Sequence, residues 1–164
     1  MRSRSVERFR RRPAETQRKE LERLLRECAR TEFGRRYGFG EIRTPGQQLI
    51  VVCGCGGDRD RTKRPEMAQI AVKYASTAIF TSDNPRHESP EAILDDMVAG
   101  LDPGGRYLRI ADRAEAIRTA VMLSRPGDIL LIAGKGHETY QIVGDVKHHF
   151  DDREEVRKSF ELLN

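Results

Sequence analysis

Short apolar runs alternate with longer amphipathic stretches over the last two-thirds of the chain. Each apolar run spans four or five residues and is typical of a buried strand: 49–53, 77–81, 107–110 and 129–133. Each amphipathic stretch has the period of a helix: 64–75, 89–100, 112–124 and 151–163. The alternation predicts an α/β fold, a Rossmann-like and mostly parallel sheet with flanking helices.

Two further apolar segments come late in the sequence. Residues 140–143 and 146–150 flank Gly144-Asp145, a pair that suits a tight turn between antiparallel strands. A β-hairpin is therefore expected after the last parallel strand.

The first 45 residues have a different pattern. After Pro13, apolar residues at Leu21, Leu24, Leu25 and Cys28 follow the helical period and predict one amphipathic helix. This segment carries 14 Lys or Arg against 7 Asp or Glu, whereas residues 46–164 carry 16 against 19. We expect a basic N-terminal segment, residues 1–45, unrelated to the domain formed by 46–164. Few aromatic residues lie among the arginines, so a solvated tail is favoured over binding to nucleic acid.

Cysteine usage and hydropathy bear on the cellular compartment. The chain has three cysteines, and Cys53 and Cys55 lie at a strand end with one residue between them, which is not the spacing of a zinc finger. Buried free thiols are favoured over metal or redox chemistry. No run of 18 apolar residues occurs, and the arginine-rich start lacks the hydrophobic segment of a secretory signal. These features predict a cytoplasmic protein without a membrane partner.

Glycine and charged residues follow three of the predicted strands, at 54–65, 82–86 and 134–138. Because the carboxyl ends of parallel strands lie at one edge of a sheet, ligands of open α/β sheets bind there. Glycine lets the backbone turn sharply and approach a ligand closely. The three strand ends therefore predict one crevice for a charged ligand.

The motifs in these segments are GCGGDRDRTKRPEM, TSDNPRHESPEAI and LLIAGKGHETYQI. In this order and spacing they resemble the C-terminal domain of the Mur ligase family. The DNPR form resembles its MurE branch, which adds meso-diaminopimelate to UDP-MurNAc-L-Ala-D-Glu in peptidoglycan synthesis. The resemblance covers about Gly46–Phe160 and implies a domain that lacks its usual first strand and helix.

The resemblance also implies a diaminopimelate site. Its members match the following positions: Arg59, Asp83, Asn84, Pro85, Arg86, Gly134 and Glu138. Arg59 and Arg86 would bind carboxylates and Asn84 would orient the ligand by hydrogen bonds. Glu138 and the Gly134 carbonyl would receive an ammonium group.

Two residues next to this site have an expected role, and two parts of the site have another interpretation. Lys135 and His137 are expected to support the site without touching the ligand, and no catalytic or metal-binding residue is expected in this chain. Alternatively, residues 83–86 form a simple turn, and Arg59 belongs to a surface cluster of ion pairs with its acidic neighbours.

The resemblance places ATP and Mg²⁺ in a central domain of the complete ligase, outside this chain, and UDP-MurNAc-dipeptide binding also needs the missing domains. We therefore expect the amino-acid-binding portion of a ligase, inactive alone. Two alternatives stay open: a stand-alone module that binds diaminopimelate or a muropeptide, and a non-functional fused fragment. The phrase at 31–42 resembles the opening of auxin-responsive-type acyl-acid amido synthetases. This second resemblance favours the fused fragment.

Overall fold

The computed structural model describes residues 48–163. The chain divides into two compact units, Met1–Gln47 and Gln48–Asn164, and the features below belong to the second unit. The amphipathic helix predicted between Pro13 and Gly34 lies outside the described residues.

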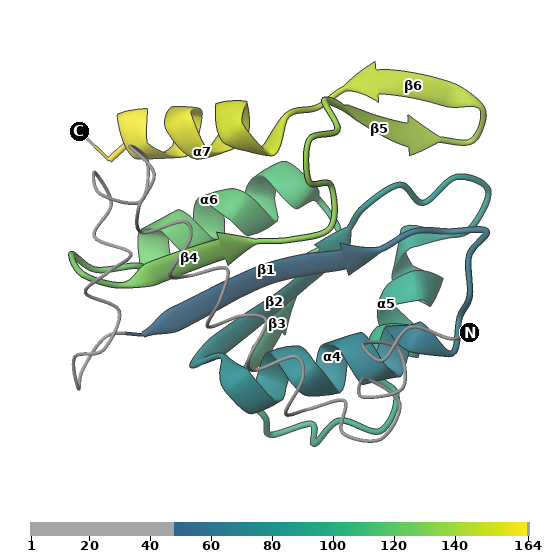
Figure 1. The fold of residues 1–164 in the computed structure, drawn as a ribbon, viewed down its shortest axis with the longest axis horizontal. Coiled ribbons are helices and arrows are strands. Elements are labelled where there is room, and N and C mark those ends of the chain that lie inside the picture. Colours follow the sequence, from purple (N-terminus) through teal and green to yellow (C-terminus); the bar gives the residue numbers. More distant parts are fainter. Residues whose placement is uncertain (1–47, 164) are drawn as a thin grey trace, which may run out of the picture. The chain divides into compact units, whose positions relative to one another are not determined.

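A parallel sheet of four strands forms the centre of the described domain (Figure 1). The strands are β1 (Leu49–Cys55), β2 (Thr77–Ser82), β3 (Tyr107–Arg109) and β4 (Ile129–Ile132), in the order β3-β2-β1-β4. In the register of the sheet, Val51 of β1 lies between Ala78 of β2 and Leu131 of β4. β1 is thus a central strand, and its apolar run is buried on both faces.

Helices cover both faces of the sheet. They are α4 (Lys63–Tyr74), α5 (Pro90–Val98), α6 (Arg113–Leu123) and α7 (Asp152–Glu161). Successive side chains of a strand point to opposite faces, so Val51 packs in the core under α4 and α5, whereas Val52 packs in the core under α6 and α7. The predicted fold class, a Rossmann-like sheet between helices, is confirmed for this domain.

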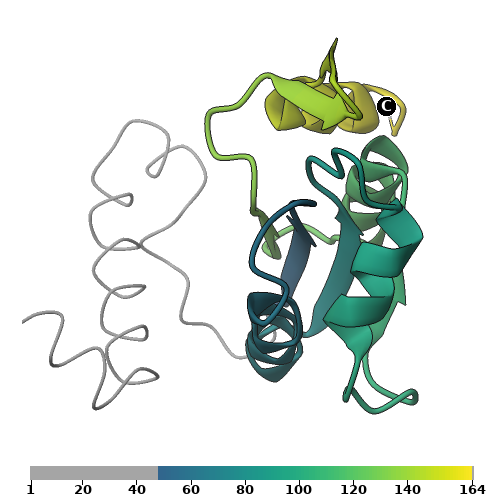
Figure 2. The ribbon, with the colours of Figure 1, turned by 90° about the vertical axis from the view of Figure 1, so that its right-hand side faces the viewer.

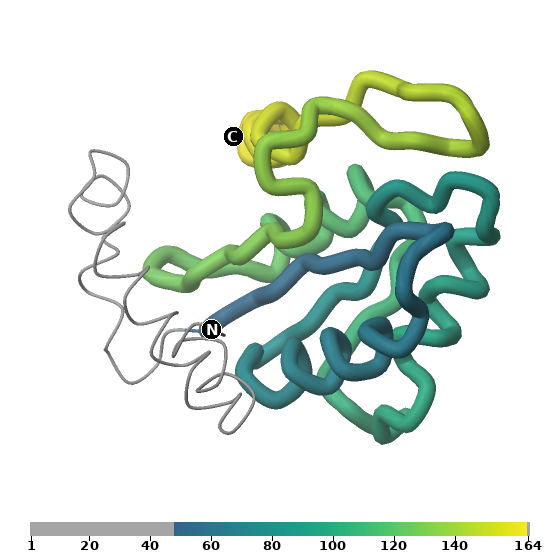
Figure 3. Tube along the Cα trace, turned by 45° about the vertical axis from the view of Figure 1, so that its right-hand side comes forward, coloured from purple at the N-terminus to yellow at the C-terminus, as the bar shows by residue number. Residues whose placement is uncertain are grey.

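The predicted hairpin is present as β5 (Tyr140–Val143) and β6 (Val146–His149), with Gly144 at a φ of 58° in the turn. It lies in the same layer as α7 (Figures 1 and 2). A parallel bridge between Arg86 and Val143 joins the hairpin to the loop after β2. Figure 3 shows the hairpin reaching over the loops at the carboxyl ends of the strands.

Cys53 and Cys55 are buried free thiols, as predicted. Burial raises the pKa of Cys53 to about 12 and that of Cys55 to about 11. Both therefore remain protonated at neutral pH and behave as small apolar side chains of the core. The helices within residues 48–163 are too short or too polar to span a membrane.

Candidate functional site

The three segments singled out in the sequence meet at one edge of the sheet. The Gly57 amide donates to the Asn84 carbonyl over 2.9 Å, which joins the loop after β1 to the loop after β2. The Asn84 side chain donates through Nδ2 to Glu138 Oε2 over 2.8 Å, which joins that loop to the segment after β4. The predicted convergence of the strand ends is therefore present in the structure.

Lys135 is buried under this edge. Its Nζ donates to Asn84 Oδ1 over 3.2 Å and to the Tyr140 carbonyl over 2.7 Å, and it lies 3.3 Å from Asp83 Oδ1. A buried ammonium needs such partners to offset its lost hydration. Lys135 thus holds the loop after β2 to the segment after β4, and its support of a bound ligand stays a prediction.

Asn84 and Glu138 form the floor of the candidate site. Asn84 is buried, and its Oδ1 also accepts from the Ile142 amide over 2.9 Å. With both ends of the amide engaged, Asn84 holds the Glu138 carboxylate in one orientation. Among the described residues, the Glu138 carboxylate is hydrogen-bonded through Oε2 alone, so Oε1 remains an available acceptor.

Arg86 adopts the left-handed region of backbone space, with a φ of 51°. Its amide donates to the Ile142 carbonyl over 3.1 Å, and its own carbonyl accepts from Gly144 over 2.8 Å. Its side chain donates through Nη1 to the Gly57 carbonyl over 2.8 Å. Residues 83–86 are therefore more than a simple turn, because the hairpin and the glycine loop hold them from two sides.

Arg59 is exposed and makes no hydrogen bond or ion pair within residues 48–163. The alternative cluster of ion pairs around it does not form. Instead, Asp58 contacts His87 Nδ1 at 3.0 Å, and Asp60 accepts from the Thr62 hydroxyl at 2.6 Å. The guanidinium of Arg59 is left available for a ligand.

The remaining predicted residues have distinct surroundings. Asp83 Oδ1 is buried and lacks a hydrogen bond in the described domain, although the Lys135 ammonium lies nearby. Pro85 is buried, and its carbonyl would lie 1.8 Å from a Cβ placed on Gly57, so only glycine fits that close approach. Gly134 has a φ of 116°, and His137 is exposed without a hydrogen bond in this part of the chain.

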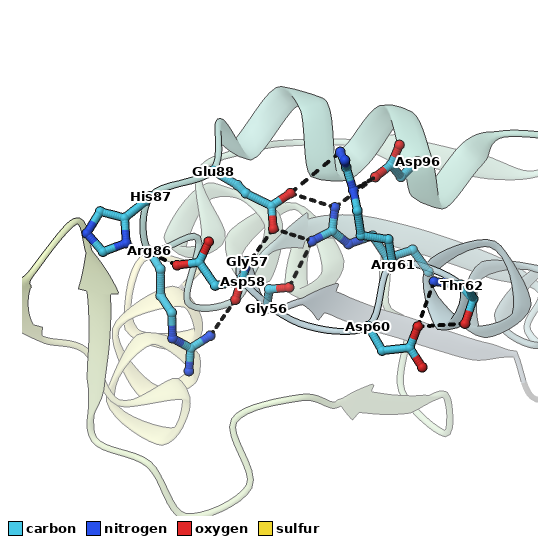
Figure 4. A network of polar contacts seen from close by, with 11 residues as sticks. Gly56, Gly57, Asp58, Asp60, Arg61, Thr62, Arg86, His87, Glu88 and Asp96 are labelled. Atoms are coloured by element: carbon cyan, nitrogen blue, oxygen red, sulfur yellow. Dashed lines mark hydrogen bonds and ion pairs between the residues drawn. The ribbon is translucent and has the colours of Figure 1, made fainter.

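Arg64 is a buried neighbour of the candidate site that the sequence reasoning missed, and Figure 4 labels its partners Gly56, Glu88 and Asp96. It is 1% exposed and donates to both oxygens of Glu88, to Asp96 Oδ2 and to the Gly56 carbonyl. Its neighbourhood holds the pKa of Glu88 down at about 2, chiefly through the Arg64 hydrogen bonds.

Arg113 was also missed. It is 2% exposed, binds both oxygens of Asp152, and donates to the carbonyls of Ser82 and Ala133. Those carbonyls immediately precede Asp83 and Gly134, so this guanidinium ties together two strand ends of the site. A signal for both arginines exists: each occupies the first position of an apolar helical stripe, continued by Ala68 and Ala71 in α4 and by Ala116, Ile117 and Ala120 in α6.

A cavity of about 280 Å³ opens beside the candidate site. Its lining includes Pro85, Asp112, Arg113 and Gln141, and of the predicted ligand-binding residues it contains Pro85 alone. The groups able to bind carboxylates and ammonium lie outside it, on the open edge formed by the three loops. The chemistry of the side chains therefore places the candidate site at that edge.

Two family models match parts of the chain that overlap at residues 38–47. Residues 38–136 match the Mur ligase, glutamate ligase domain. Residues 2–47 match the GH3 family N-terminal domain, which confirms the separate resemblance of the N-terminal segment.

Individual relatives agree with the larger match. The UDP-N-acetylmuramoyl-L-alanyl-D-glutamate--2,6-diaminopimelate ligase of Geobacillus thermodenitrificans is 62% identical over 112 residues, which is 68% of this chain and 23% of that protein. The enzyme of the same name from Chlorobaculum tepidum is 62% identical over 113 residues, 69% of this chain and 22% of the relative. A solved structure of a ligase with this name has a TM-score of 0.70 at 47% identity, covering 79% of this chain and 26% of that one. The chain thus spans about a quarter of the length of these relatives.

Proposed function

We propose, because this chain belongs to the Mur ligase, glutamate ligase domain family, that residues 48–163 form the amino-acid-binding portion of an ATP-dependent ligase. The reaction would join meso-diaminopimelate to UDP-MurNAc-L-Ala-D-Glu in the cytoplasm, during peptidoglycan synthesis. The names of the relatives favour this substrate over other amino acids.

One observation carries the proposal. Charged groups that are free to bind a ligand lie beside side chains that are held in place by hydrogen bonds. Arg59 is unpaired within the described domain, Arg86 uses one of its donors on the Gly57 carbonyl, and Glu138 keeps one oxygen open. Diaminopimelate has two carboxylates and two ammonium groups when free. At this edge, Glu138 and one arginine complement the ammonium and the carboxylate of the non-reacting end. The second arginine complements the other carboxylate of the ligand.

Positioning is the chemical contribution of such a site. If Glu138 and the Gly134 carbonyl hold the distal ammonium, and the arginines hold carboxylates, the other amino group is oriented toward an acyl donor. A positioned nucleophile reacts as if it were present at a very high local concentration. Activation of the acid would belong to other domains of the complete enzyme, together with UDP-MurNAc-dipeptide binding.

The described residues do not fit ATP or its Mg²⁺. Lys135, in the only glycine-flanked Lys turn of residues 48–163, directs its ammonium to Asn84, Tyr140 and Asp83 rather than outward. Within this range, no three His, Cys, Asp or Glu side chains are grouped so that they could hold a metal ion. In the complete ligase, ATP and Mg²⁺ would bind in other domains.

Calorimetric titration of the full chain with meso-diaminopimelate tests the proposal, with lysine as the control ligand. Saturable binding of diaminopimelate is expected. Lysine lacks the distal carboxylate and leaves an arginine unpaired, so its binding should be at least tenfold weaker. Equal binding of the two ligands would contradict the assignment of the arginines.

Arg86→Ala sharpens the test. Loss of a charge-assisted pair should weaken diaminopimelate binding about tenfold to a hundredfold, while the circular dichroism spectrum stays unchanged. Arg118→Ala is the matched control, because Arg118 is an exposed arginine of α6 that pairs with Glu115. An unfolded Arg86→Ala variant would argue for a structural role instead.

A chimaera separates this proposal from its alternatives. Residues 48–163 would replace the corresponding portion of the Geobacillus thermodenitrificans ligase. Diaminopimelate-dependent ATP hydrolysis is the expected result for a ligase portion. Ligand binding by the isolated chain with an inactive chimaera would indicate a binding module, and the failure of both would indicate a fused fragment without function.

A further inference from the structure

Arg64 occupies a position where an apolar residue would be ordinary. It begins the helical stripe that continues in Ala68 and Ala71 against the sheet. Removing a guanidinium from water is costly, and buried ion pairs often contribute no more stability than well-packed apolar residues. Moreover, the Nε of Arg64 is buried without a hydrogen-bond partner in the described domain. Stability alone is thus a poor reason for this arginine.

The partners of Arg64 show what it arranges. Its Nη2 donates to the Gly56 carbonyl over 3.2 Å and to Glu88 Oε1 over 2.8 Å. The same Glu88 oxygen accepts from the Asp58 amide over 2.6 Å. Arg64 therefore holds the backbone on both sides of Gly57, once directly and once through Glu88.

Gly57 itself is held from the opposite loop. Its amide donates to the Asn84 carbonyl, and its carbonyl accepts from Arg86. The glycine turn Gly56–Asp58 is consequently tied at every residue, either to the loop after β2 or to Arg64 and Glu88. Arg59 follows immediately, so the placement of its Cα depends on this turn.

We propose that Arg64 is a positioning residue of the amino-acid site: by locking the Gly56–Asp58 turn against the 84–88 loop, it sets the separation of Arg59 and Arg86. This inference rests on the proposed function. Two arginines at a set separation favour a ligand with two carboxylates over a ligand with one. Arg64 thereby contributes to the choice of diaminopimelate over a mono-carboxylate diamine without touching either.

Amide hydrogen exchange measured by NMR on the full chain tests the lock without any ligand. In Arg64→Lys, which keeps the charge and loses the fork, the Gly57 and Asp58 amides should exchange at least tenfold faster than in the wild type. Amides of the central strands, such as Val52 and Ile79, should exchange at unchanged rates. Unchanged exchange in the turn, or an equal acceleration in the strands, would overturn the proposal.

Arg61→Lys is the matched control. Arg61 also contacts Asp96 and Glu88, at 2.9 and 3.6 Å, but its side chain is 62% exposed and makes no hydrogen bond to the glycine turn. Its replacement should leave exchange of the Gly57 and Asp58 amides unchanged. If Arg64→Lys does not fold, Glu88→Gln replaces it, and the Asp58 amide should then exchange several-fold faster. A Glu88→Gln variant with wild-type exchange would overturn the proposal.

Ligand binding supplies the second readout. The ratio of lysine to diaminopimelate dissociation constants should fall at least fivefold in Arg64→Lys, whereas a merely structural loss would weaken both ligands equally and overturn the role in selectivity. If the wild-type chain binds neither ligand and the chimaera is also inactive, the proposed function fails, and the lock is then decided by hydrogen exchange alone.

Discussion

The two buried arginines of this domain both lie in the first turn of a helix, but they differ in what they connect. Arg113 joins regular elements: the ends of β2 and β4 and the first turn of α7. Arg64 joins two loops, the glycine turn after β1 and the connection before α5 through Glu88, and also binds Asp96 of α5. The same side chain thus supports the scaffold in one place and the geometry of the candidate site in the other.

Their surroundings predict different energetic consequences. Asp152, the carboxylate bound to Arg113, is 14% exposed and engaged through both oxygens. The carboxylates bound to Arg64 are more accessible, with Glu88 at 21% and Asp96 at 35% exposure. Water can replace a lost partner more easily at the second site, so the cost of losing Arg64 should be smaller and more local.

The largest effect is expected for Arg113→Met. It leaves Asp152 without its partner and removes the donors of the Ser82 and Ala133 carbonyls. Breaking a buried pair in this way costs about 3–5 kcal/mol of unfolding free energy. Urea denaturation measures it, with Arg118→Met on the same helix as the control, where a surface pair contributes under about 1 kcal/mol. A smaller loss of unfolding free energy than in the control would show that Arg113 does not stabilise the scaffold.

Arg64→Met should cost less, about 2 kcal/mol, since its partners regain hydration when the guanidinium is gone. The same urea experiment compares the two arginines directly. If Arg64→Met destabilises the domain as much as Arg113→Met, the distinction between a scaffold arginine and a loop arginine is wrong.

The next test of the Arg64 network is the loss of unfolding free energy at acid pH. The pKa of Glu88 is lowered from 4.5 to about 2, chiefly by hydrogen bonds from Arg64. A depressed folded-state pKa stabilises the fold above pH 4.5 and loses that contribution as the pH falls toward 2. Glu88→Gln should flatten this part of the profile, measured by urea denaturation between pH 3 and pH 6. Asp151, whose pKa is also about 2, keeps its contribution in both proteins.

His87 should give the smallest effect. Its pKa is raised above 6.5, first by the hydrogen bond with Asp58 and then by the charge of Asp145. A raised folded-state pKa contributes stability below pH 6.5 that is lost as the pH rises through the folded value. Thermal unfolding at pH 5.5 and pH 8.5 should therefore show a small extra loss for the wild type relative to His87→Gln. An identical pH dependence would show that this exposed contact is energetically neutral.

The regular elements were predictable because their signals are local. Every described helix and strand begins and ends within two residues of its predicted bounds, including the hairpin around Gly144. Apolar periodicity records which face is buried, and glycine and proline mark the turns. The convergence of three strand ends followed from a general property of parallel sheets.

The contacts within the site were harder to predict. Arg59 has acidic neighbours in sequence, yet the structure pairs Asp58 with His87 and Asp60 with Thr62. Asn84 was expected to orient the ligand, and the structure shows its amide already engaged by Glu138, Lys135 and Ile142. Choices between several nearby partners depend on side-chain geometry that a linear pattern does not contain.

The α/β architecture, the family of residues 38–136 and the residue types available for a doubly charged ligand can all be inferred from the amino-acid sequence. Tertiary structure alone decided that Arg64 and Arg113 lie inside the domain and that Lys135 faces inward. The physical reason is that burial of a charge depends on acceptors brought together from distant segments. Gly56 and Glu88, or Ser82 and Asp152, become neighbours only when the chain has folded.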